Sequence, residues 1–237
     1  MESGRTRYSS GPKALLMRCR AMFVFLDFEA SSLSKRSRPI EVAWVFEDGR
    51  SEAHLIRSAP GWDDWDAQAQ AIHHIDRGTL ETDGSPHDAV AKRMVEVLAG
   101  HDLFASAPSW DGKWLSALLR AAGLPRHSLR LRDTEEAQRE TAAAILADWI
   151  GPDDLARAVE DLVVLTDFRE RSGPPAHRAL ADALDEHRRW IAVREAALRQ
   201  RAEASLNRPP AAGRPAQSAG REAAAGSAAS SSPLPES

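Results

Sequence analysis

Two carboxylates stand two residues apart in an apolar setting near the start of the chain. Asp27 and Glu29 enclose Phe28 and follow an apolar run over residues 22–26. If this run is a strand, residues i and i+2 share one face, so both carboxylates point the same way. Two anions beside an apolar strand are costly without a counter-charge, and Mg²⁺ or Mn²⁺ prefers carboxylate oxygens. The pair therefore indicates a divalent-metal site, although a strand end that turns into solvent would explain the same two acids.

Three further polar residues stand where a fold could bring them to this pair. Asp111 lies at the predicted start of a helix, where an acid also complements the helix dipole in a purely structural role. His177 and Asp182 lie near the start of the last predicted helix. Residues i and i+5 of a regular helix differ by about 140°, so these two converge only if His177 precedes the first turn, which Pro174-Pro175 permits. A histidine there can accept a proton from water, although a lone histidine is usually a surface residue.

The composition places the chain among globular proteins and excludes several kinds of site. It has 237 residues, 43% hydrophobic and 28% charged, which suffices for one domain with a buried core. The longest apolar run, residues 21–26, is too short to cross a bilayer. A single cysteine, Cys19, excludes a disulfide framework and a multi-thiolate zinc site within one chain. We therefore expect a cytoplasmic protein that does not contact membranes.

Charge and complexity divide the chain into three parts. Residues 1–20 form a basic segment without apolar periodicity, and residues 207–237 consist mainly of Ala, Ser, Pro, Gly and Arg; both are predicted to be disordered tails. The predicted single domain, residues 21–206, carries 23 basic and 32 acidic residues, a net charge of −9. A body this acidic is a poor electrostatic binder of nucleic acid, so a nucleic-acid enzyme with this sequence needs something other than bulk charge.

The elements that must position these residues follow from periodicity and turn signals. Strands are predicted over residues 22–28, 40–46, 51–56, 102–105 and 129–131. The second and third are expected to be antiparallel, because Glu47-Asp48-Gly49-Arg50 is a hairpin signal. Helices are predicted over residues 87–99, 110–122, 134–165 with an interruption at Gly151-Pro152, and 176–205. This order predicts an α/β domain with a mixed β-sheet flanked by α-helices.

Taken together and in order, these segments resemble the DEDDh branch of the 3′→5′ exonucleases, the proofreading-type (DnaQ-like) nucleases of the ribonuclease H-like superfamily. The first motif is similar to residues 25–29 and the segment after it to residues 39–43, while residues 110–115 and 177–183 resemble the second and third motifs. Residues 71–75 resemble the family's His-Gly-Ile stretch, with His74 in place of the glycine. The family often has His-Asn before the second-motif aspartate, where this chain has Ser106-Ala107.

The resemblance implies a ribonuclease H-like fold and a metal-dependent 3′→5′ exonuclease. Its substrate would be the 3′ end of single-stranded DNA or RNA, and its products nucleoside 5′-monophosphates. Two Mg²⁺ or Mn²⁺ ions would be held by Asp27, Glu29, Asp111 and Asp182, with Asp27 bridging both. His177 would take a proton from the attacking water. The implied substrate-binding residues are Phe28, Ala30, Ile72, His73 and Trp114.

Several alternatives remain open from the sequence. A catalytically weak or inactive exonuclease-fold module could bind nucleic acid or a partner instead, and a metal-free protein could carry all these acids on its surface. Ile72 and His73 could be packing residues, and Trp114 has the helical spacing of a core residue. Loop residues Trp62 and Trp65 could stack on bases or pack against the body, and the basic loop residues could meet phosphates or stay solvated; these are Lys35, Arg36 and Arg38. A homodimer or a polymerase or repair partner is a further expectation.

Overall fold

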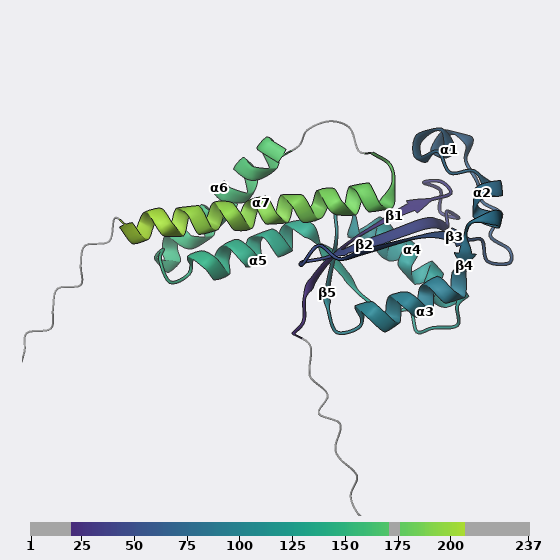
Figure 1. The fold of residues 1–237 in the computed structure, drawn as a ribbon, viewed down its shortest axis with the longest axis horizontal. Helices are drawn as coiled ribbons and strands as arrows, with labels where there is room; N and C mark the ends of the chain where they lie inside the picture. The colour runs from purple at the N-terminus through teal and green to yellow at the C-terminus, as the bar shows by residue number, and fades with distance from the viewer. Residues whose placement is uncertain (1–19, 171–175, 207–237) are drawn as a thin grey trace, which may run out of the picture. The chain divides into compact units, whose positions relative to one another are not determined.

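The computed structural model describes residues 20–170 and 176–206, which all belong to one compact unit that ends at Leu206 (Figure 1). The tails predicted at residues 1–20 and 207–237 fall outside the described residues, apart from Arg20. The strands are β1 Phe23–Ala30, β2 Pro39–Phe46, β3 Ser51–Arg57, β4 Ser85–Pro86, β5 Asp102–Ala105 and β6 Leu131–Asp133. The helices are α1 Ala67–His73, α2 Arg77–Thr82, α3 His87–Leu98, α4 Pro108–Ala121, α5 Thr134–Leu146, α6 Pro152–Glu170 and α7 Ala179–Leu206.

The six strands form one mixed sheet in the order β4-β3-β2-β1-β5-β6. The predicted hairpin is confirmed, because β2 and β3 are antiparallel and joined through Gly49, whose φ of 86° only glycine adopts freely. β1 lies inside the sheet, antiparallel to β2 and parallel to β5. The predicted mixed sheet flanked by helices is therefore confirmed.

The two faces of β1 pack against different helices. Val24, Leu26 and Phe28 belong to the large core beneath α3 and α4, where they meet residues such as Met94 and Leu118. On the other face Phe25 packs with Phe104 and with Trp190 of α7. Because side chains alternate along a strand, Asp27 and Glu29 share the face of Phe25 and point towards α7. The hydrophobic pattern of β1 thus decides which helix completes the site.

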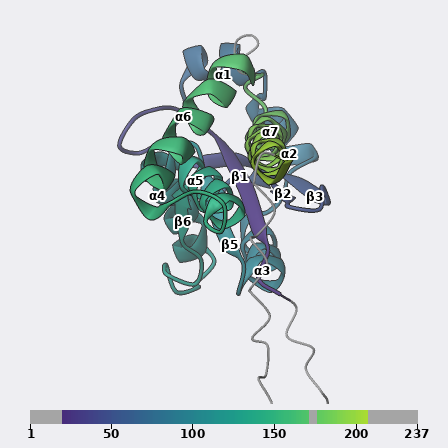
Figure 2. The same ribbon diagram turned by 90° about the vertical axis from the view of Figure 1, so that its left-hand side faces the viewer.

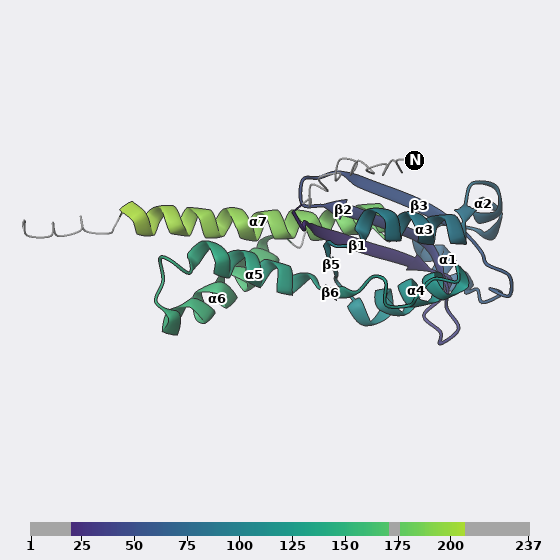
Figure 3. The same ribbon diagram turned by 90° about the horizontal axis from the view of Figure 1, so that it is seen from below.

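Helices α5, α6 and α7 pack on one another and extend beyond the sheet (Figures 1 and 3). Figure 2, in which α7 is seen nearly end-on, shows α5 and α6 beside it. Leu146, Val163 and Val193 form the centre of this second core. The first part of α7 also contacts β1 and β2, so this helix is shared between the sheet and the bundle. None of the described helices is long and apolar enough to cross a membrane.

Some elements differ from the sequence-based expectation. Helices α1 and α2 and the two-residue strand β4 were not predicted, because segments of two to seven residues carry too little periodicity to detect. Asp66 and Asp76 accept hydrogen bonds from Gln68 N and Thr79 N, so N-cap signals for both helices were present in the sequence. β6 begins at Leu131, two residues later than predicted.

Candidate active site

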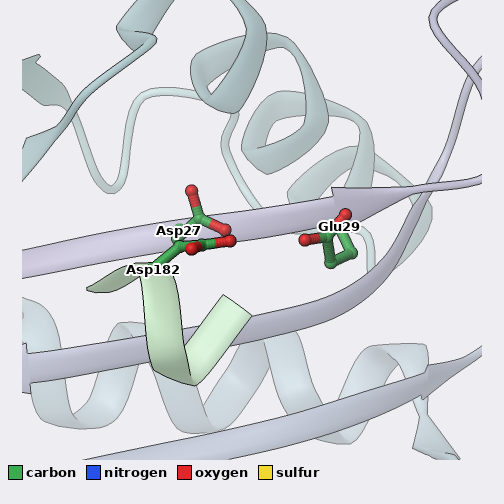
Figure 4. A group of neighbouring side chains, drawn as sticks. All are labelled: Asp27, Glu29 and Asp182. Carbon is green, nitrogen blue, oxygen red and sulfur yellow. The ribbon is translucent and has the colours of Figure 1, made fainter. Parts of the chain in front are cut away.

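Three carboxylates converge where β1 meets the first turn of α7. Asp27, Glu29 and Asp182 each offer an oxygen, and these oxygens all lie within 4.8 Å of one another. Figure 4 shows Asp27 and Glu29 along β1, with Asp182 reaching towards Asp27 from the start of α7. β1 supplies its pair from one face, and the packing of α7 on that face supplies the third acid. This part of the predicted set is therefore assembled from residues 155 positions apart in the chain.

Asp111 lies in the first turn of α4 and is close enough to Asp27 to act on its charge. This helix begins directly after β5, with Pro108 in its first turn. The Asp111 side chain is buried, with only 2% of the residue exposed, and its Oδ2 atom has no hydrogen-bond partner among the described residues. Asp111 is also the charge with the strongest electrostatic effect on Asp27. A buried carboxylate oxygen without a partner is costly in a purely structural role, which favours a ligand for it.

Burial and mutual repulsion raise the pKa values of these carboxyl groups. Burial, followed by repulsion from Asp111, Glu29 and Asp182, raises the pKa of Asp27 well above its usual range. Burial and the neighbouring Asp182 raise the pKa of Glu29 to about 7, although Arg178 opposes the shift. Burial raises the pKa of Asp111 to about 7, against backbone hydrogen bonds that lower it. Without a cation, some of these carboxyl groups are therefore protonated at neutral pH, and the site carries less than its full negative charge.

An ion pair that the sequence-based prediction missed anchors the start of α7. Glu41 on β2 lies opposite Glu29 in the strand register and is 4% exposed. It accepts two hydrogen bonds from Arg178, from Nε at 3.1 Å and from Nη2 at 2.7 Å, and a third from the Ala179 backbone N–H at 3.0 Å. Glu41 thereby fixes the turn that carries Asp182. Both residues lay inside segments of the family resemblance, but their pairing across 137 positions has no local signal.

His177 lies just outside α7, which begins at Ala179. Its backbone has a φ of 51°, in the left-handed region that costs a non-glycine residue free energy. The Ala176 N–H donates to Asp182 Oδ1 at 3.1 Å, so the same carboxylate that joins the cluster also holds the segment before the helix. This position outside the helix removes the helical geometry that would direct His177 and Asp182 to different faces.

His73, at the end of α1, is 2% exposed and has one free ring nitrogen. The Ile75 N–H donates to its Nδ1 at 3.1 Å, so a neutral ring carries its proton on Nε2, which has no partner among the described residues. Burial lowers the pKa of His73; Glu41 opposes this shift, while the nearby Arg178 and His177 add to it. His74 ends α1 with a φ of 59°, a conformation that favours the glycine of the family stretch.

The other residues predicted to contact substrate have varied environments. The side chains of Phe28, Ala30 and Trp114 lie in the core, and the Trp114 indole N–H donates to Ser37 Oγ at 2.9 Å. Ile72 is 50% exposed. Whether these residues meet substrate stays a prediction.

The loop tryptophans and Arg36 contact other residues of the protein. Trp65 donates to Gln70 Oε1 at 2.8 Å, and Trp62 packs partly against the core beneath the Arg38 guanidinium. Arg36 forms an exposed ion pair with Asp63 at 2.6 Å. These contacts place both tryptophans against the body rather than free in solvent.

The chemistry of the four acids fits divalent cations. Hard oxygen ligands at this density suit Mg²⁺ or Mn²⁺, and a cation would satisfy the unpartnered Oδ2 of Asp111. It would also remove the repulsion that raises the pKa of Asp27 and Glu29. The residues present are therefore suited to hold such ions.

Comparison with known proteins finds solved structures of similar fold but no matching sequence family. No protein-family model matches the chain, and no curated protein is significantly similar to it in sequence. Escherichia coli exonuclease I in complex with a dT13 oligonucleotide is 19% identical, with a TM-score of 0.53 over 79% of this chain and 43% of that one. The same enzyme in complex with a dA16 oligonucleotide is 18% identical, with a TM-score of 0.52 over 76% and 42%. Exonuclease I from Methylocaldum szegediense is 17% identical, with a TM-score of 0.50 over 72% and 40%.

The chain spans less than half the length of these solved nucleases. At such identity the likeness concerns the fold: the mixed sheet and its flanking helices match those of exonuclease I. This agrees with the α/β fold, a mixed sheet flanked by helices, that the sequence predicted.

Proposed function

We propose that this protein is a divalent-metal-dependent 3′→5′ exonuclease that hydrolyses single-stranded DNA and releases nucleoside 5′-monophosphates. The observation that carries the proposal is the convergence of Asp27, Glu29 and Asp182 within 4.8 Å, with buried Asp111 beside them. Three converging acids with a fourth nearby repel a phosphodiester as well as one another, so this site suits phosphate chemistry only with bound cations. DNA is favoured over RNA because solved proteins of this fold are complexes with dT13 and dA16 oligonucleotides.

In the proposed reaction, bound Mg²⁺ or Mn²⁺ ions would activate water and neutralise charge on the scissile phosphate. Asp27, Glu29, Asp111 and Asp182 would hold these ions. His177 is assigned to accept the proton of the attacking water. A bond forms between that water oxygen and phosphorus while the bond from phosphorus to the O3′ of the preceding nucleotide breaks. His73, whose Nε2 has no hydrogen-bond partner among the described residues, is assigned to donate to the terminal nucleotide.

Hydrolysis of a labelled strand with matched variants tests the proposal. A 5′-fluorescent dT12 strand with saturating Mn²⁺ should shorten from its 3′ end and yield thymidine 5′-monophosphate, and EDTA should stop the reaction. Asp182→Asn should abolish cleavage, because it removes a charge from the cluster. Asp185→Asn is the control, since Asp185 lies on the same helix but pairs with Arg188 at the surface. Equal cleavage by the two variants would contradict the assignment of the site.

Two other outcomes are informative. A blocked 3′ end should protect the strand, whereas an unchanged rate would indicate endonuclease activity. Retained strand binding without cleavage by the unaltered protein, with either metal, would favour an inactive exonuclease-fold module that binds nucleic acid. RNA of the same length, tested beside DNA, decides the sugar preference through the 2′-hydroxyl.

A further inference from the structure

A group of cations on and next to helix α4 is not explained by the fold. Arg38 precedes β2, while Lys113 and Arg120 lie on α4; we refer to these three residues as the basic strip. Arg38 and Arg120 line a hollow of about 500 Å³ together with Trp62 and His87. Arg38 is also close enough to Lys113 to lower the pKa of its ammonium, after the larger effect of burial. The domain as a whole is acidic, so this grouping of positive charge requires a reason.

Most arginines elsewhere in the described chain are neutralised by carboxylates. Examples are the pairs Arg36–Asp63, Arg93–Glu52, Arg132–Glu136, Arg139–Glu160 and Arg178–Glu41. Within the described residues, by contrast, none of the basic strip forms an ion pair with a carboxylate. Lys113 donates to Ser34 O and Ser37 Oγ, and the carboxylate of Asp64 acts on its charge without forming an ion pair with it. Arg38 lies over the Trp62 ring at 5.8 Å. Arg38 and Lys113 repel each other, and Arg38 shares a hollow with Arg120, so the grouping indicates an external anion.

The residues of the strip on α4 lie in a row, so an extended anion bound to them would follow the helix axis. Lys113 and Arg120 are seven residues apart, so they share one helix face and are separated by about 10 Å along its axis. Trp110, one turn before Lys113, is 39% exposed, and Lys113 Nζ lies 4.7 Å from its ring. Asp111 is the next residue. An aromatic platform followed by two cations therefore leads away from the acid cluster along one helix.

We propose that the basic strip binds the phosphates of a single-stranded polynucleotide on the 5′ side of the scissile bond, with a base stacked on Trp110. This inference rests on the proposed function, because the acid cluster holds the 3′ end and only the upstream strand remains to be bound. About 10 Å corresponds to about three nucleotides of a stacked strand. Interleaved aromatic and basic side chains are typical of sequence-independent single-strand binding. The strip thereby supplies the local attraction that the acidic body lacks.

Strand binding without catalysis provides the first test. In EDTA, fluorescence anisotropy of 5′-fluorescein dT12 measures the dissociation constant, Kd, at several salt concentrations. Arg120→Ala and Arg38→Ala should each raise Kd by roughly threefold to tenfold and reduce the slope of log Kd against log salt by about 0.7. Arg130→Ala is the matched control, because Arg130 is exposed and lines a different hollow, between β5 and β6. Thermal melting of each variant confirms that it is folded.

Substrate length provides the second test. The ratio of kcat/KM for dT12 to that for the dinucleotide dT2 should fall roughly threefold to tenfold in Arg120→Ala and stay constant in Arg130→Ala. Unchanged Kd and an unchanged ratio in the strip variants would overturn the proposal. If the unaltered protein cleaves neither substrate but Arg120→Ala still weakens strand binding, the role of the basic strip is supported and the proposed exonuclease function is refuted. Hexaglutamate, tested by the same anisotropy method, represents an acidic protein partner. If Arg120→Ala and Arg38→Ala weaken binding of hexaglutamate but not of dT12, the strip binds such a partner and the proposal is overturned.

Discussion

Neutralising Asp111 should stabilise the metal-free protein, and the gain should grow with pH. Burial raises the pKa of Asp111 to about 7 from the 3.8 of an ordinary aspartate, so between these two pH values the folded state holds a proton that the unfolded state has lost. Stability therefore falls as pH rises through this window, by about 1.4 kcal/mol per pH unit. Asp111→Asn carries no titratable proton and lacks this slope.

The magnitude follows from the same two pKa values. Between pH 5 and pH 8, the contribution of Asp111 to the unfolding free energy of the unaltered protein falls by about 2.5 kcal/mol. Since about 1 kcal/mol shifts the melting temperature of a domain this size by about 2–4 °C, the advantage of the variant should widen by about 5–10 °C over that range. Removal of the charge also relieves Asp27, which adds to the effect in the same direction.

Thermal melting in EDTA at pH 5, 6, 7 and 8 measures this widening. Glu203→Gln on the exposed end of α7 is the control and should keep a constant difference from the unaltered protein. Saturating Mn²⁺ should raise the melting temperature of the unaltered protein more at pH 8 than at pH 5, because the ion binds the deprotonated acids. A pH-independent difference between Asp111→Asn and the unaltered protein would refute the reasoning that burial keeps this carboxyl protonated.

Three further substitutions probe other parts of the site and fold. Glu41→Gln removes the charge that holds Arg178 and should lower the unfolding free energy by about 1–3 kcal/mol in urea; an unchanged midpoint would contradict the anchoring role. His177→Asn should reduce kcat by about 10²- to 10⁴-fold while the Mn²⁺-induced rise in melting temperature persists, and loss of that rise would instead indicate a metal ligand. Gly84→Ala should cost about 1–3 kcal/mol in urea, because a Cβ there would lie 2.3 Å from Leu80 O; a neutral result would show that the α2 turn yields easily.

Local patterns predicted the centre of the fold well. The apolar run before Asp27 made β1 a buried strand, and the Asp48-Gly49 turn made β2 and β3 a hairpin, since both signals depend only on neighbouring residues. The short helices α1 and α2 were missed because about two turns give no reliable periodicity. His74 shows the limit of a motif comparison: the departure from glycine is real, yet the backbone keeps the left-handed conformation with a φ of 59°.

The candidate site divides in the same way. The sequence by itself determined the residue types, the shared face of Asp27 and Glu29, and the order in which the acids occur, because strand alternation is a property of the local chain. Only the tertiary structure decided that Asp182 reaches that face, that Asp111 is buried without a partner, and that Glu41 holds Arg178. It also decided which cations remain unpaired. Charge pairing and burial depend on packing between segments that lie far apart in the chain, and no local periodicity encodes those distances.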